Sequence, residues 1–214
     1  LIKQYRSVAV HAEVDAAAED IVNESIVSSE NQSPVTLILD HVEGLSDQVK
    51  KVMTDEFKNI CSMLRFTELG HDIFRRWYID GRIYHHLVVD DKNLKQGIQE
   101  IRPIDATKIR KVKEIQKNKD QATGATLVQN VNEFYIYQEK PGGTTSGVKL
   151  SNDSVSYVTS GLLDVDRKKV VSFLHKALKP INQLRMMEDS LVIYRLARAP
   201  ERRIFYIDVG NLPR

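Results

Sequence analysis

Residues 164–199 most constrain the fold, because their apolar residues recur at the three- and four-residue steps of one long amphipathic helix. The apolar stripe consists of Val170, Leu174, Ala177, Ile181, Leu184 and Leu191, and is widened by Val171, Leu178 and Val192. Polar residues recur every seven positions on another face, namely Lys169, Lys176, Gln183 and Ser190. Such a helix would be about 50 Å long, buried along one broad side and solvated along the other.

Aspartates and prolines set the expected limits of this helix. Asp164 or Asp166 would cap its N-terminus, and Pro200 would end it. Pro180 lies inside the pattern. Because proline has no N–H to donate and its ring crowds the carbonyl four residues earlier, we expect a kink at Pro180. Beyond the helix, residues 202–209 predict a final strand.

The first 70 residues predict helices and one short strand. Residues 7–28 carry apolar positions at helical spacing and end in a polar linker. Residues 35–39 are β-branched and apolar, which favours a strand. A second helix would begin at the N-cap Ser46 and stop at Gly70.

The middle of the chain predicts a small antiparallel sheet. Residues 74–89 predict a hairpin around the two-residue turn Asp80-Gly81, with Trp77 opposite Tyr84. Further strands are expected at 99–104, stopped by Pro103, and at 133–138, 148–150 and 154–158, with a flexible loop at 141–147. The predicted fold class is therefore α+β: a helical domain with a small antiparallel sheet, then a long kinked helix and a terminal strand.

Composition and charge are typical of a folded protein with an uneven charge distribution. Apolar residues make up 42% of the chain and charged residues 28%, which excludes wholesale disorder. No apolar run approaches the roughly 20 residues of a membrane-spanning helix. Residues 1–60 carry 11 acidic and 5 basic side chains, a net charge of −6, and the remaining residues carry 18 and 26, a net charge of +8.

Much of the positive charge lies in residues 108–119. Its basic residues are Lys108, Arg110, Lys111, Lys113, Lys117 and Lys119. A solvated edge strand or exposed arm explains this run, because lysine-rich edges resist unwanted pairing. The alternative is phosphate contact, which would make the protein a cytoplasmic nucleic-acid-binding adaptor; the run has no aromatic residue on which a base could stack.

The sequence contains no pattern that predicts an enzyme. The P-loop, the dinucleotide-binding glycine pattern, His-Glu-x-x-His, Cys-x-x-Cys and Gly-x-Ser-x-Gly do not occur. The adjacent His85 and His86 would point to opposite faces of a strand, so they do not predict a metal site. Cys61, the single cysteine, lies beside a helical apolar stripe and is expected to be a packed thiol. We therefore expect no catalytic residue, no cofactor and no metal, but a structural or binding protein.

Four stretches of the chain resemble the portal vertex protein of tailed bacteriophages of the T-even type. They are residues 74–91, with Phe-Arg-Arg-Trp-Tyr-Ile-Asp-Gly-Arg-Ile-Tyr-His-His, residues 101–111, with Ile-Arg-Pro-Ile-Asp-Ala-Thr-Lys, and residues 152–165 and 191–213. Their order is also that of the family, and the resemblance covers essentially the whole chain.

The resemblance implies a structural role at one vertex of a phage capsid. Portal proteins form dodecameric rings around a channel for double-stranded DNA, and they contact the terminase large subunit and the major capsid, scaffold and neck proteins. The expected location is the virion, after assembly in the host cell cytoplasm or at the inner membrane surface. No cofactor is implied.

The resemblance also divides the chain into three parts. Residues 1–163 would be the wing domain, 164–199 a stem helix and 200–214 the start of the clip domain. The returning stem helix, the rest of the clip and the crown are missing, so the chain is expected to be a fragment. The apolar stripe would pack against sister subunits, Arg202 and Arg203 would lie near the motor, and the polar row beginning at Lys169 would face DNA, a neighbouring subunit, the capsid or solvent.

Overall fold

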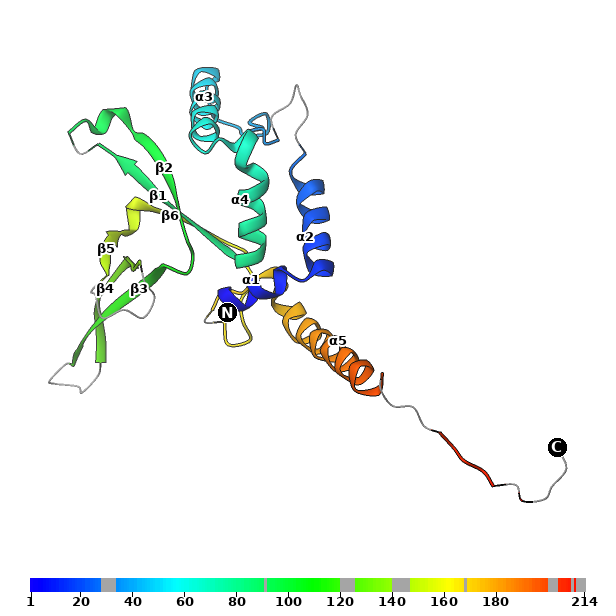
Figure 1. Cartoon of the computed structure of the whole chain (residues 1–214). Coiled ribbons are helices and arrows are strands. Elements are labelled where there is room, and N and C mark those ends of the chain that lie inside the picture. The colour runs from blue at the N-terminus through cyan, green and yellow to red at the C-terminus, as the bar shows by residue number, and fades with distance from the viewer. Residues whose placement is uncertain are drawn as a thin grey trace. The chain divides into compact units, whose positions relative to one another are not determined.

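A computed structural model describes residues 1–27, 34–90, 92–119, 126–139, 147–167, 169–199, 204–208 and 210 (Figure 1). The chain divides into two compact units, Leu1–His175 and Lys176–Arg214. Among the described residues, the first unit contains four α-helices and two antiparallel sheets, and the second contains one long α-helix, so the predicted α+β class is confirmed.

Two N-terminal helices replace the single helix predicted for residues 7–28. Helix α1 spans Ile2–Ala9 and α2 spans Ala12–Ser25, with His11 in extended conformation between them. The bend lets the apolar faces of both helices pack on one later helix, α4. Their buried side chains are Tyr5, Val8, Ala9, Val14, Ala18 and Val22.

The next helix begins where it was predicted but ends earlier. Helix α3 spans Asp47–Met63, and the Ser46 hydroxyl accepts a hydrogen bond from the Val49 N–H at 3.4 Å. Gly70 does not stop this helix, because a new helix, α4, already spans Phe66–Asp80. The strand predicted at 35–39 is also wrong: this segment has no strand structure.

The predicted hairpin at 74–89 is wrong, because its first half is helical. Gly81 is the C-cap of α4, in left-handed conformation with φ of 72°, and strand β1 follows at Arg82–Val89. Trp77 and Tyr78 pack on Phe173, with ring centroids 5.3 and 5.0 Å apart. These aromatic contacts fix α4 as a helix, and the Asp-Gly pair ends it instead of turning a hairpin.

We expect Gly81→Ala to destabilise the first unit strongly. A left-handed backbone costs an L-residue about 1–2 kcal/mol, and an added Cβ would lie 2.7 Å from the Cα of Ser172. The matched control is Gly161→Ala, because Gly161 also has a positive φ of 75° but has no atom within 4 Å of an added Cβ. Equal shifts of the urea midpoint in both variants would contradict a role for the Ser172 contact.

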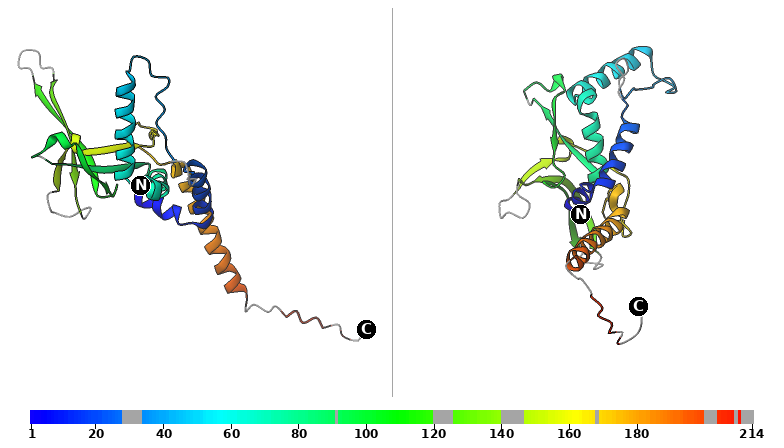
Figure 2. Two further views of the ribbon diagram at one scale, coloured as in Figure 1. Left: turned by 90° about the horizontal axis from the view of Figure 1, so that it is seen from above. Right: turned by 45° about the vertical axis from the view of Figure 1, so that its right-hand side comes forward.

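The strands form two three-stranded antiparallel sheets (Figure 2). In the first, of order β2-β1-β6, β2 spans Ile98–Ile104 and β6 spans Val155–Thr159. In the second, of order β3-β4-β5, the strands span Ile109–Lys119, Thr126–Tyr137 and Val148–Ser151. The short 3₁₀ helices η1 and η2 span Leu94–Gln96 and Asn152–Ser154. Residues 141–146 of the predicted loop lie outside the described residues.

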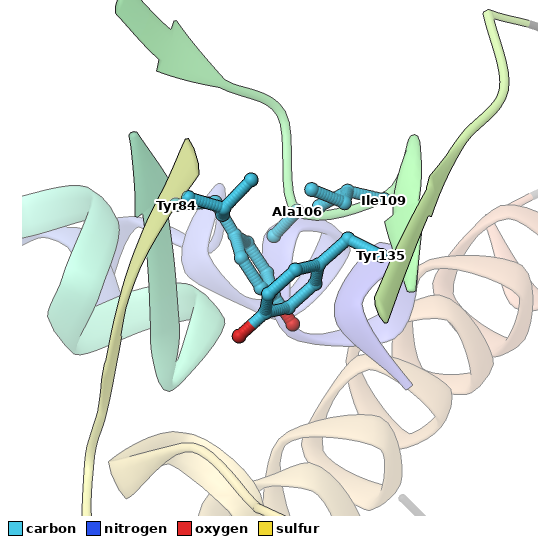
Figure 3. Close-up of a cluster of buried hydrophobic side chains, with 5 residues drawn as sticks. Tyr84, Ala106, Ile109 and Tyr135 are labelled. Carbon is cyan, nitrogen blue, oxygen red and sulfur yellow. The ribbon is translucent and has the colours of Figure 1, made fainter. Parts of the chain in front are cut away.

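Tyrosines join the two sheets into one core (Figure 3). Tyr84 of β1 stacks on Tyr157 of β6 at 4.7 Å between ring centroids, and meets Tyr135 of β4 edge to face at 6.1 Å. The other buried members of the cluster are Ala106, Ile109 and Val155. Burial raises the pKa of the Tyr84 hydroxyl well above its usual value.

The helix predicted over residues 164–199 is wrong in its first third. Leu163 pairs with Val170 in an isolated bridge, and the Asp164 N–H donates to the carbonyl of Lys169 at 2.9 Å, so neither aspartate caps a helix. Val171 and Ser172 are buried, and the Ser172 hydroxyl donates to the carbonyl of Tyr78 at 3.0 Å. Packing on the end of α4 therefore overrides the helical spacing of the apolar residues here.

Helical structure begins with the 3₁₀ helix η3, Phe173–Ala177, and continues as α5, Leu178–Arg198. Pro180 is the third residue of α5, in the first turn, where the backbone N–H groups have no partner within the helix. A proline at this position removes no hydrogen bond within α5. The kink at Pro180 stays a prediction. Residues 204–208 are described without strand structure, so no terminal strand is seen there.

Candidate subunit interface

The sequence of α5 favours a regular helix. Its residues are mostly strong helix formers such as Leu, Met, Arg and Glu. Arg195 and Arg198 lie in the last turn, where the helix dipole favours positive charge, and the Arg198 guanidinium lies 4.7 Å from the Tyr194 ring centroid. Twenty-one residues correspond to about 32 Å of helix.

The second half of α5 exposes apolar side chains around its whole circumference. Each is at least 52% exposed: Met186, Met187, Leu191, Val192, Ile193, Tyr194 and Leu196. At 100° per residue, Leu191, Val192 and Ile193 alone cover three different sides of the helix. The sequence-based expectation of one apolar and one solvated side is wrong for this half. Charged residues such as Arg185 and Arg195 lie between these apolar side chains, so the helix is not wholly apolar. Because apolar surface is nevertheless exposed on several sides, we expect α5 to be covered from more than one direction.

The predicted apolar stripe is divided between the two units. Val170 and Leu174 belong to the first unit, where Leu174 is buried. Ile181 and Leu184 are half-buried on the first turns of α5, and Leu191 is exposed. Ala177 is the last residue of η3.

The predicted polar row does not lie on one helix. Lys169 precedes the helical segment and Lys176 lies in η3, whereas Gln183 and Ser190 share one exposed face of α5. The Ser190 hydroxyl donates to the carbonyl of Met186 at 2.6 Å. Arg202 and Arg203, the predicted motor-docking residues, lie outside the described residues.

Most of the basic segment 108–119 forms the edge strand β3, as expected if the segment is a solvated edge strand. Lys113 of β3 lies directly opposite Glu133 of β4, whose carboxylate is 3.3 Å from the Lys113 ammonium and 2.7 Å from that of Lys111. The contact with Lys111 lowers the pKa of the Glu133 carboxyl. Lys108 is not part of β3 and lies in the turn before it.

Within the described ranges, no group of three or more His, Cys, Asp or Glu residues is placed to hold a metal ion. His85 is buried in β1, and burial lowers the pKa of its imidazole; His86 points to the other face of the sheet. Nor is any described helix long and apolar enough to cross a membrane.

Comparison with known proteins decides the family. The profile of the bacteriophage T4-like portal protein (Gp20) family matches residues 1–214. The chain belongs to this portal protein family. The portal protein of Vibrio phage KVP40 is 40% identical over 225 residues, covering 100% of this chain and 43% of that protein. The portal protein of Salmonella phage ViI is 34% identical over 227 residues, covering 99% and 40%.

The chain thus spans about two fifths of the length of these portal protein relatives. The sequence predicted a single apolar stripe on this helix and therefore missed the apolar residues on the other sides of α5. Their signal was present in the consecutive apolar residues 191–194, which no single helical stripe can contain.

Proposed function

We propose that this chain is part of a portal protein that forms a ring at one vertex of a phage capsid. The observation that supports the ring most directly is the exposed apolar circumference of α5. A helix that stands between two neighbours in a ring is covered on both sides, so it needs apolar surface on both. A helix with a single apolar stripe could be covered by one contact alone. Burying each large apolar side chain there would contribute about 1.5–3 kcal/mol.

The proposal revises the three parts of the chain. The wing would extend to residue 175 and the stem helix would be α5, Leu178–Arg198, in place of residues 164–199. Residues 200–214 would begin the clip, with Arg202 and Arg203 near the terminase large subunit. Gln183 and Ser190 are the two members of the polar row that remain available as a channel face.

In this role the protein would act as a passive conduit. Twelve copies would surround double-stranded DNA, let it pass inward during packaging and outward at ejection, and seat the capsid, scaffold and neck proteins. A channel through which DNA slides needs few phosphate contacts, because each neutralised phosphate adds affinity. The energy of translocation would come from the terminase.

The family match favours this role over the nucleic-acid-binding adaptor. Two of the lysines on which the adaptor depends, Lys111 and Lys113, already contact Glu133.

Electron microscopy of the complete protein tests the proposal. We expect closed rings with a central channel, and no ATP turnover from the purified protein, because no nucleotide-binding loop occurs in this chain. Particles that stay monomeric at micromolar concentration, or ATP hydrolysis that maps to this chain, would contradict it.

A further inference from the structure

A basic groove lies between α4 and the two sheets of the first unit. It has a volume of about 930 Å³, and its walls come from α1, α4, β1, β2, the turn before β3, and β4 and β5. Six of its lining residues are cationic: Arg6, Arg75, Arg76, Arg82, Arg102 and Lys108. Its three carboxylates are those of Asp72, Asp80 and Asp105.

The groove keeps positive charge after its internal ion pairs are formed. Arg6 contacts both Asp80 and Asp105, at 2.6 and 2.9 Å, and Arg76 contacts Asp72 at 2.9 Å, so every carboxylate of the lining has a partner. Two further cations are paired with carboxylates outside the lining, Arg75 with Asp15 and Arg102 with Glu100. In contrast, neither Arg82 nor Lys108 has a carboxylate partner among the described residues. Arg82 instead donates to the carbonyl of Val170. The groove is therefore suited to an anionic occupant.

A matching acidic surface lies on α2 of the same chain. Glu13, Asp20 and Glu24 recur at seven- and four-residue steps, so they share one face of the helix, about 16 Å long. This acidic ridge lies on the side of α2 away from its buried residues, and all three side chains are exposed without an ion pair in the described part of the chain. The exposed Ala16 and Ala17 lie between the acids, and small side chains allow close approach.

Ridge and groove of one subunit do not face each other. Figure 1 shows α2 and the two sheets on different sides of α4, and both views of Figure 2 agree. The groove lies on the sheet side, whereas the ridge points away from α4, on which α2 packs. One subunit therefore cannot satisfy both surfaces, but a second copy can.

We propose that the acidic ridge of α2 in one subunit binds in the basic groove of the next. Two different complementary surfaces on one protomer make a head-to-tail contact, which closes into a ring when the rotation allows it. The inference rests on the proposed ring and names the surfaces that meet outside the stem.

A carbodiimide cross-link tests this contact without any new side chain. The reagent joins a carboxylate to an amine at contact distance, and Lys108 is the only lysine of the groove lining. Rings of the complete protein are assembled from equal amounts of ¹⁵N-labelled and unlabelled subunits, cross-linked and analysed by mass spectrometry. We expect mixed-isotope peptides that join Lys108 to Glu13, Asp20 or Glu24, and their loss in Lys108→Ala.

Charge reversal gives the second readout. Glu13→Lys/Asp20→Lys/Glu24→Lys and Arg102→Glu/Lys108→Glu should each weaken association on the order of tenfold at low salt, and less at high salt, because exposed charges are screened. Combining both sets should restore association. Rings that form normally in every variant, with no mixed cross-link, would overturn the contact but leave the ring intact. A Lys108→Glu variant that lost DNA affinity but assembled normally would also overturn the contact between ridge and groove. Wild-type protein that forms no ring would instead contradict the proposed function.

Discussion

Leu191→Lys/Leu196→Lys in the complete protein is expected to abolish ring formation. Both side chains lie on α5, are more than half exposed in the single chain and point to different sides of the helix. Each would have to place a charged ammonium in an apolar contact between subunits, and every contact around the ring would be affected. Lysine keeps the helix propensity of leucine, so α5 itself should persist.

Mass photometry and electron microscopy measure this outcome, with Gln183→Lys/Ser190→Lys as the matched control. Gln183 and Ser190 are exposed polar residues of the same helix, so their substitution adds the same two charges without removing apolar surface. We expect the control to form rings and the double variant to remain dissociated, with circular dichroism unchanged. Rings of normal size in the double variant would show that α5 is not covered by sister subunits.

Arg6→Ala is expected to destabilise the first unit by about 3 kcal/mol, the cost of leaving a buried charge without its partner. Arg6 donates two hydrogen bonds to Asp80, at 2.9 and 2.6 Å, and two to Asp105, at 3.1 and 2.9 Å. The Asp80 side chain is only 6% exposed, so without Arg6 its carboxylate is desolvated and unpaired. The contact ties α1 to the end of α4 and to the turn after β2.

Urea denaturation of the complete protein measures the effect. A destabilised first unit should unfold at a lower urea concentration, so the midpoint of its transition should fall. Arg102→Ala is the control: Arg102 also contacts a carboxylate, that of Glu100 at 2.6 Å, but both side chains are mostly exposed, so little change is expected. Arg6→Ala/Asp80→Asn should recover part of the loss, since it removes the buried charge. Equal losses in Arg6→Ala and Arg102→Ala would contradict the argument.

The same network predicts how stability depends on pH. The hydrogen bonds from Arg6 lower the pKa of the Asp105 carboxyl to about 2. The unfolded carboxyl titrates near 3.9, so this contribution is complete above about pH 4 and is lost as the pH falls towards 2. The stability of the wild type should therefore fall more steeply in this range than that of Arg6→Ala.

The sequence correctly predicted those elements whose local pattern is compatible with a single type of secondary structure. The N-cap Ser46 and the strands around Glu133 and Val155 are examples. Asp80-Gly81 has two meanings, since the pair suits both a hairpin turn and the end of a helix. Phe173, more than 90 residues later, decides between them by packing on Trp77 and Tyr78. No local pattern contains that contact.

The candidate surfaces differ in the same way. The apolar circumference of α5 comes from consecutive residues, so it was open to prediction from the sequence. The basic groove draws its cations from α1, α4, β1, β2 and a turn, and only the folded chain brings Arg6, Arg82 and Lys108 together. The spacing of Val170 and Leu174 misled the helix prediction, because a buried irregular segment and a helix stripe both need apolar residues.

The anchored segment before η3 has a mechanical consequence. Ser172 is held by the carbonyl of Tyr78, Val171 donates to the carbonyl of Leu162, and Arg82 holds the carbonyl of Val170. Tension applied along the backbone from α5 would reach these bonds before it reached β6. Part of the load would then pass to α4 and to Arg82 at the start of β1, so that Tyr157 of β6 would be shielded from force exerted on the helix.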